Sequence, residues 1–255
     1  MKKLIGIATL LSVVTLGFTG CYYTSANSDT RTYDVTGFTG VNVSSAFQVV
    51  ITRADGYSIT VTAPHIEQVR VEKQGNTLKV WREGNLWFTP FQAQPKVEIG
   101  LPSLTSIELS GASRGEVSGF DSEEQMEIII SGASSLDVGD IATGELKAKV
   151  SGASRLEGNI KSEGNAEIEV TGASTVNLDG YANDIDLEAS GASRASLGDY
   201  YAKNGDVTLS GASKGTVNLT GRLDANISGA SDLSWKGNPT MGSIQTSGAS
   251  SLHKA

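Results

Sequence analysis

Apolar and polar residues alternate along most of this chain, and the alternation leads repeatedly into a short phrase of small residues. In most copies the residues three and one places before the phrase are apolar, as in Ile128/Ile130 and Ile168/Val170. A period of two is typical of β-strands with one buried and one solvated face. The phrase is Ser-Gly-Ala-Ser, and its eight copies begin at Ser110, Ser131, Ser151, Thr171, Ser190, Ser210, Ser228 and Ser247.

Successive copies start 18 to 21 residues apart, which is the spacing of a solenoid built from stacked repeats. A second apolar pair follows the phrase, as in Leu136/Val138, and a glycine often comes next. Each coil is therefore predicted to hold a strand, the phrase, a second strand, a glycine-marked corner and a looser return. This pattern predicts an all-β fold, a single-stranded right-handed parallel β-helix with coils of about 20 residues.

The phrase itself suits a crowded place in each coil, because its residues are small and glycine adopts dihedral angles that other residues avoid. Strict alternation would point the glycine and the second serine inward, whereas a bend at glycine would put the alanine inside. The sequence leaves both arrangements open. Stacked serines on successive coils would be able to hydrogen-bond one another.

Four segments follow from these patterns. Residues 1–20 are expected to be a lipoprotein signal peptide, 21–34 a tether, 35–102 an N-terminal β segment or first coils, and 103–255 the repeat β-helix. The last two segments are expected to form one continuous body. Val43-Ser44-Ser45-Ala46-Phe47 is a degenerate copy of the phrase, which indicates that the solenoid begins before Ser110.

The N-terminus has the pattern of an export signal. Met1-Lys2-Lys3 precedes an apolar run of 13 residues, Leu4 to Leu16, which is too short to span a bilayer. Small residues then precede the single cysteine, Cys21, as in a bacterial lipobox, where the thiol is acylated (palmitate included) after cleavage. Several acyl chains together anchor a protein stably. We therefore expect an exported protein, lipid-anchored in the cell envelope at the outer membrane or cell surface; the alternative is an ordinary secretory signal with an incidental cysteine.

The charge balance limits the partners. The formal net charge is −8, and the chain after residue 20 has 18 basic against 28 acidic residues. Phosphate backbones need a basic surface, so we expect no nucleic-acid partner. The sequence predicts no cofactor and no metal site, and it leaves the oligomeric state open.

Two groups of residues are candidate binding sites. The segment from Trp81 to Phe91 is rich in aromatic residues and is predicted to be a loop or hairpin tip; it either binds a ligand through Trp81, Trp87, Phe88 and Phe91 or plugs the open end of the solenoid. The second candidate is an acidic face, where adjacent coils bring like charges together and lysines on the preceding coil, Lys147 and Lys149, partly offset them. The alternative is a solvated charged surface. Its members are Glu167, Glu169, Asp186 and Glu188.

Signals for catalysis are weak. Two copies of the phrase fit the nucleophile-elbow pattern Gly-x-Ser-x-Gly, around Ser113 and Ser213. That pattern has meaning only between a strand and a helix with a histidine nearby, and the only histidines are His65 and His253. No catalytic residue is therefore assigned.

Three stretches resemble the bacterial head GIN domain family, known as putative autotransporter adhesins. They are Gly37–Phe47, Asn76–Val80 and Leu101–Ile107, the last running into the phrase at Ser110. The resemblance covers residues 35 to 255 and implies a β-helical envelope protein, often lipid-anchored, with an adhesive or structural role.

The function expected from sequence is that of a non-enzymatic envelope lipoprotein that acts as an adhesin-like binding or structural module. Its expected partners are the membrane, through the N-terminal lipid, and a glycan or surface-protein ligand. The alternative is a polysaccharide-processing β-helix enzyme of the lyase or hydrolase type, which would use carboxylates on one coil face. An ice-binding hydroxyl array is disfavoured, because glycine separates the hydroxyls and the coil length varies.

Overall fold

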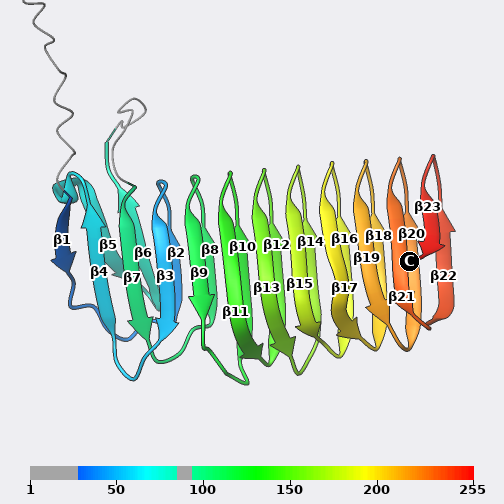
Figure 1. The fold of residues 1–255 in the computed structure, drawn as a ribbon, viewed down its shortest axis with the longest axis horizontal. Coiled ribbons are helices and arrows are strands. Elements are labelled where there is room, and N and C mark those ends of the chain that lie inside the picture. The colour runs from blue at the N-terminus through cyan, green and yellow to red at the C-terminus, as the bar shows by residue number, and fades with distance from the viewer. Residues whose placement is uncertain (1–27, 85–93) are drawn as a thin grey trace, which may run out of the picture.

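A computed structural model describes residues 28–84 and 94–255, which form a flattened solenoid of two stacked sheets (Figure 1). Sheet 1 has the strand order β1 (Asp29–Thr32), β4 (Ser58–Ala63), β7 (Lys96–Leu101), β3 (Gln48–Arg53), β9 (Arg114–Ser118), β11 (Ser135–Thr143), β13 (Arg155–Ser162), β15 (Thr175–Tyr181), β17 (Arg194–Ala202), β19 (Lys214–Leu219), β21 (Asp232–Gly237) and β23 (Ser251–Lys254). Sheet 2 has the order β22 (Thr240–Thr246), β20 (Arg222–Ile227), β18 (Asn204–Leu209), β16 (Asp184–Ala189), β14 (Ala166–Val170), β12 (Glu145–Val150), β10 (Gln125–Ile130), β8 (Ser106–Leu109), β2 (Gly40–Val43), β6 (Thr77–Arg82) and β5 (Val69–Gln74). The short 3-10 helix η1 spans Ile66–Gln68.

The repeat region stacks in parallel, with equivalent residues of successive coils side by side. Ile128 of β10, for example, lies between Ile107 of β8 and Ala148 of β12. The inner faces of the two sheets pack together into one continuous core. Residue sizes match across this core: a Cβ at Gly115 would meet the Leu109 side chain at 2.6 Å and the Leu136 side chain at 2.9 Å. The predicted β-solenoid with coils of about 20 residues is confirmed.

The phrase forms the turn that leads from sheet 2 to sheet 1 in each coil. Its second serine is buried in every copy from Ser113 to Ser231, with at most 2% of its surface exposed. Its glycine and alanine are exposed at the edge of the solenoid, and Gly172 has a φ of 76°. The sequence left open which side chains of the phrase face the core. The second serine points inward, as strict alternation requires, whereas the glycine and the alanine lie outside.

Hydrogen bonds tie neighbouring phrases together. The Ala173 N–H donates to the Gly152 carbonyl at 2.7 Å, and the same contact recurs along the row of turns. The expected serine ladder forms only in part: the Ser193 and Ser213 hydroxyls are 3.3 Å apart, but the Ser213 hydroxyl also donates to the Ser210 carbonyl at 2.7 Å. Backbone contacts between coils therefore hold the turns more regularly than the hydroxyls do.

The glycine that follows the second strand does not end it in every coil. Strand β13 runs through Gly158, at a φ of 135°, and β15 runs through Gly180, at a φ of 126°. The predicted glycine-marked corner is therefore wrong at these two positions, and also at Gly139 inside β11 and Gly198 inside β17. Gly158 lies so close to the backbone of Val138 on the preceding coil that no side chain fits there.

The N-terminal end departs from chain order. Strands β6 and β7 pair in parallel with β2 and β3, so their coil lies outside the β2–β3 coil although it comes later in the sequence. Antiparallel strands then extend both sheets to their N-terminal edges, β4 and β1 in sheet 1 and β5 in sheet 2. Phe38 and Tyr57 are in contact with ring centroids 4.9 Å apart and ring planes tilted by 51°. The degenerate phrase is confirmed as a turn of the stack, since the Ala46 N–H donates to the Gly111 carbonyl at 2.9 Å.

Candidate functional site

The acidic face lies on the outer side of sheet 2. Glu167 of β14 is in register with Asp186 of β16, and Glu169 is in register with Glu188. Neighbouring parallel strands are about 4.8 Å apart, so each pair brings two carboxylates close together. The structure thus places the four acidic residues on two adjacent strands; a ligand for them stays a prediction.

Lysines on the preceding coil engage the two glutamates of β14. The Lys147 Nζ lies 2.7 Å from a Glu167 carboxylate oxygen, and the Lys149 Nζ lies 3.4 Å from Glu169. The hydrogen bond to Glu167 raises the pKa of Lys147, so this lysine stays charged. Half of the acidic face is therefore neutralised within the sheet, at exposed sites where such pairs add little to stability.

The other half of the acidic face continues toward the C-terminus. Asp186 is in register with Asp206 of β18, which is in register with Asp224 of β20. Desolvation raises the pKa of Asp186, and the nearby carboxylates of Asp206, Glu188 and Glu167 raise it further. Sequence reasoning missed Asp206 and Asp224, although both occupy the outward position that Glu167 and Asp186 hold in their own strands.

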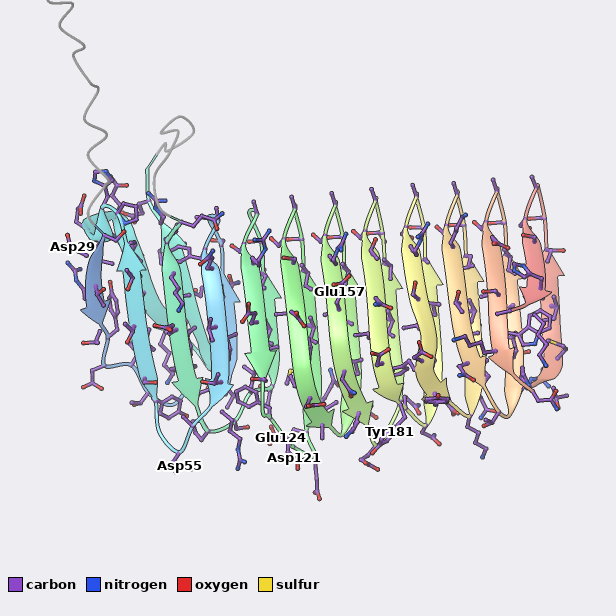
Figure 2. The ribbon with its side chains drawn as sticks, viewed as in Figure 1. Asp29, Asp55, Asp121, Glu124, Glu157 and Tyr181 are labelled. Atoms are coloured by element: carbon purple, nitrogen blue, oxygen red, sulfur yellow. The ribbon has the colours of Figure 1, made fainter. Side chains whose placement is uncertain are left out.

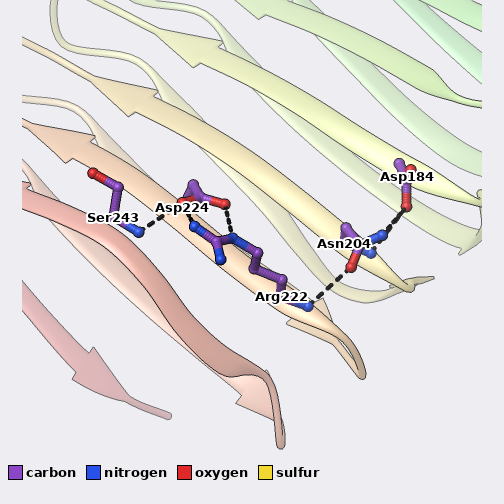
Figure 3. Close-up of polar contacts among 5 residues, drawn as sticks. All are labelled: Asp184, Asn204, Arg222, Asp224 and Ser243. Atoms are coloured by element: carbon purple, nitrogen blue, oxygen red, sulfur yellow. Dashed lines mark hydrogen bonds and ion pairs between the residues drawn. The ribbon is translucent and has the colours of Figure 1, made fainter.

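Asp224 differs from Asp186 because it has partners (Figure 3). The Arg222 Nη2 donates to an Asp224 carboxylate oxygen at 2.8 Å, and the Ser243 N–H donates to the same oxygen at 2.6 Å. These hydrogen bonds lower the pKa of Asp224 to about 2, and the bond from Arg222 has the largest effect.

The same network continues along the edge of sheet 2 (Figure 3). The Arg222 N–H donates to the Asn204 side-chain oxygen at 3.0 Å, and the Asn204 side-chain amide donates to the Asp184 carboxylate at 2.8 Å. With the Ser243 contact, the network links four successive coils, mainly through side chains that the repeat does not specify.

The chemistry open to this face follows from how its side chains point. Asp184, Asp186, Asp206 and Asp224 border a hollow of about 260 Å³ between outward side chains. Side chains at equivalent places on parallel strands project in the same direction, so the carboxylates of Asp186, Asp206 and Asp224 form a row, and Asp184 lies two residues before Asp186 on the same strand. A glycosidase needs two carboxyl groups on opposite sides of the scissile bond. Within residues 28–84 and 94–255, no group of three or more histidine, cysteine, aspartate or glutamate residues is arranged to hold a metal ion.

The aromatic segment is described only in part. Trp81 lies on β6 in register with Arg70 of β5, and it is half-buried on the outer face of sheet 2. Trp87, Phe88 and Phe91 lie outside the described residues, as does Cys21. Along the chain, β6 of sheet 2 is followed by β7 of sheet 1, the same order of sheets that the phrase connects in the other coils. Trp81 itself does not plug the end of the core, because its side chain lies on the outer face of sheet 2.

No helix among the described residues has the length and apolar character needed to cross a bilayer.

Fold and surface together define a β-solenoid whose long outer faces carry in-register columns of polar and charged side chains. The chain belongs to the family described as putative auto-transporter adhesin, head GIN domain, whose model matches residues 37–239. That description names an adhesin and no enzymatic activity.

Solved structures share the fold. A putative adhesin from Parabacteroides distasonis matches with a TM-score of 0.79 at 15% identity, covering 90% of this chain and 98% of that one. A putative lipid binding protein from the same organism matches with a TM-score of 0.76 at 18% identity, over 90% of this chain and 97% of that one. A putative adhesin from Bacteroides fragilis matches with a TM-score of 0.67 at 20% identity, over 91% and 98%. No curated protein matches the sequence.

Proposed function

We propose that this protein is a non-enzymatic binding or structural module of the cell envelope, anchored by lipid at Cys21, that presents the outer faces of its solenoid to a ligand. The observation that carries the proposal is the strict register of the coils, which aligns outward side chains from distant parts of the sequence into long columns. A repeating polymer or a fibrous surface would meet equivalent groups on successive coils, and many weak contacts then add up.

The anchor gives the module a direction. Cys21 precedes β1, and β1 lies at the outermost N-terminal position of sheet 1, at the opposite end from β22 and β23 (Figure 1). A lipid at Cys21 would therefore hold the N-terminal end of the solenoid near the membrane and leave the C-terminal coils furthest from it. The family description as an adhesin supports an envelope location for such a module.

The anchor is tested by cell fractionation. Cys21→Ser should release the protein from membranes, because it removes the acylated thiol while leaving the solenoid unchanged. Retention of the variant in the membrane fraction would contradict lipid anchoring. Labelling of intact cells with a membrane-impermeant reagent, compared with lysed cells, then decides which side of the envelope the solenoid faces.

The binding role is tested with a panel of glycans and matrix proteins presented to the wild-type protein. Trp81→Ala, Trp87→Ala and Phe91→Ala probe the aromatic segment, and Asp186→Asn with Glu188→Gln probes the acidic face. A variant that loses binding identifies its face as the site. If the protein binds nothing on the panel, or instead depolymerises acidic polysaccharides, the proposal fails.

A further inference from the structure

Two cations on the outer face of sheet 1 lack an acidic partner. Arg194 of β17 and Lys214 of β19 are in register on neighbouring coils, and both side chains are exposed. Neither lies within ion-pair distance of a carboxylate in the part of the chain that the structure describes. Two other cations of this face are paired: the Lys236 Nζ lies 3.3 Å from Asp199, and an Arg155 guanidinium nitrogen lies 3.3 Å from Glu157. Arg114 and Lys161 also have no ion pair among the described residues, but neither has another cation in register beside it.

A row of hydroxyl groups runs beside these two cations. Ser196, Thr216 and Ser234 occupy the next outward position of β17, β19 and β21 and are in register with one another. The Thr216 and Ser234 hydroxyls are 2.9 Å apart. Together with Arg194, Lys214 and Asp232 they border a hollow of about 320 Å³. We call Arg194, Ser196, Lys214, Thr216 and Ser234 the basic patch.

The edges of the patch are well defined. Asp232 follows Lys214 in the same column, but the His253 Nδ1 lies 3.2 Å from its carboxylate and the Ser251 hydroxyl donates to it at 2.6 Å. This aspartate is therefore already engaged on the side away from Lys214.

The composition of the face changes along the solenoid toward the patch. In the earlier coils Arg114 and Arg155 stand beside a column of acids formed by Glu116, Asp137 and Glu157, the last labelled in Figure 2. From β15 onward that column continues with Asn177, Ser196 and Thr216. The cations persist while the neighbouring acids give way to neutral hydrogen-bonding groups.

The same coils are acidic on their opposite face, where Asp186, Asp206 and Asp224 project from sheet 2. An anion that approaches this negatively charged protein is thus repelled from sheet 2 and attracted to the basic patch on sheet 1. The guanidinium group of Arg194 offers a fork of donors that matches a carboxylate, and Lys214 adds a second charge one strand spacing away.

We propose that the basic patch binds an acidic glycan, with Arg194 and Lys214 on its carboxylate groups and the hydroxyls of Ser196, Thr216 and Ser234 on its neutral sugar hydroxyls. This inference rests on the proposed function as a binding module and names the ligand class. A nucleic acid fits less well, because the patch has two cations and no aromatic side chain on which bases would stack.

Binding is measured with polygalacturonate oligomers as the probe and the mature lipidated chain in detergent, with neutral dextran for comparison. The test variant is Arg194→Gln/Lys214→Gln. Its matched control is Lys147→Gln/Lys149→Gln, which changes the net charge equally but on sheet 2, where both lysines are paired. We expect the test variant to bind about tenfold more weakly, the scale of losing charge-assisted hydrogen bonds. The control should stay within about twofold of wild type, and added salt should weaken wild-type binding.

Three outcomes would overturn the inference: no binding of polygalacturonate, equal weakening of both double variants, or tighter binding of single-stranded DNA than of polygalacturonate. If polygalacturonate fails but another glycan or matrix protein binds at a different face, the basic patch is refuted and the proposed function stands. If nothing on the wider panel binds, the proposed function fails as well. Thermal unfolding of each variant confirms that the solenoid is intact.

Discussion

Gly172→Ala tests whether glycine recurs in all eight copies of the phrase because neighbouring backbones crowd there. Gly172 has a φ of 76°, and a Cβ added to it would lie 2.5 Å from the Gly152 carbonyl oxygen and 3.1 Å from the Gly152 nitrogen. Both contacts are with backbone, which cannot move aside as a flexible side chain can. Because the Ala173 N–H also donates to that carbonyl, any shift stretches the contact between coils.

Three contributions determine how much Gly172→Ala should change the free energy of unfolding. The left-handed conformation costs an alanine about 1–2 kcal/mol. Forcing a methyl group into a packed site costs about 1–3 kcal/mol. The lower entropy of the unfolded chain offsets about 0.4–1 kcal/mol of this. We therefore expect Gly172→Ala to lower the free energy of unfolding by about 1–5 kcal/mol.

Alanine substitutions at other glycines separate the conformational strain from the backbone crowding. Gly75 has a φ of 59° with nothing within 4 Å of its added Cβ, so Gly75→Ala should cost only the conformational strain, a net loss of about 1 kcal/mol or less. Gly164 is outside the left-handed region but its Cβ would lie 2.7 Å from the Gly144 carbonyl oxygen, which isolates the crowding. Gly56 has neither feature, and Gly56→Ala should be neutral or stabilising by about 0.4–1 kcal/mol.

Urea unfolding followed by circular dichroism gives the ranking. Solenoids lose coils separately when one interface is weakened, so amide hydrogen exchange around residues 150–190 should accompany the measurement. If Gly172→Ala is no less stable than Gly75→Ala, backbone crowding is not the reason for the glycine and the reasoning fails.

Three further predictions concern single polar groups. The Tyr200 hydroxyl is buried without a hydrogen-bond partner among the described residues, so Tyr200→Phe should raise the free energy of unfolding by about 1 kcal/mol in urea unfolding; a loss would contradict this. Because the fold raises the pKa of Asp186, stability falls as pH rises through that pKa. Asp186→Asn should therefore stabilise the protein by about 0.5 kcal/mol at pH 7 but not near pH 3. Equal effects at both pH values would refute the repulsion between Asp186 and the neighbouring carboxylates. Arg222→Gln should raise the pKa of Asp224 from about 2 toward its ordinary value, as followed by NMR titration, whereas Lys147→Gln should leave it unchanged.

The repeat region was predictable from sequence because one physical rule governs each coil. Apolar residues two apart, such as Ile168 and Val170, have to face the core, and a constant coil length stacks them in register. The small phrase marks the turn for the same reason, since Gly172 lies against the backbone of Gly152.

The N-terminal end and the polar surface were less predictable. Strands β4 and β5 show the same alternation as the others, and nothing in Ile59/Val61 or Val69/Val71 reveals that they pair in antiparallel fashion. The partner of β4 is β7, which lies far along the chain and is chosen by packing at the end of the stack. Strand β5 instead pairs with the next strand, β6, through the turn at Gly75-Asn76, and this turn is the one local signal of a hairpin. The Arg222–Asp224 contact was missed although residues two apart on a strand share a face, because most outward positions of the repeat are polar and alternation alone does not show which of them pair.

Packing constraints explain where a solenoid of this kind can carry specificity. Inward positions such as Leu156 and Val176 have to fill the core, and the glycine of the phrase has to fit against the next coil, so neither can vary freely. Outward positions meet no such constraint. Because the coils are in register, an outward side chain on one coil lies beside the equivalent side chains of the coils before and after it. The outward column that runs from Glu157 through Asn177 to Ser196 changes from acidic to neutral within three coils while the fold around it stays the same. A ligand that binds this surface therefore contacts the variable outward residues, and the Ser-Gly-Ala-Ser phrase keeps those residues in register.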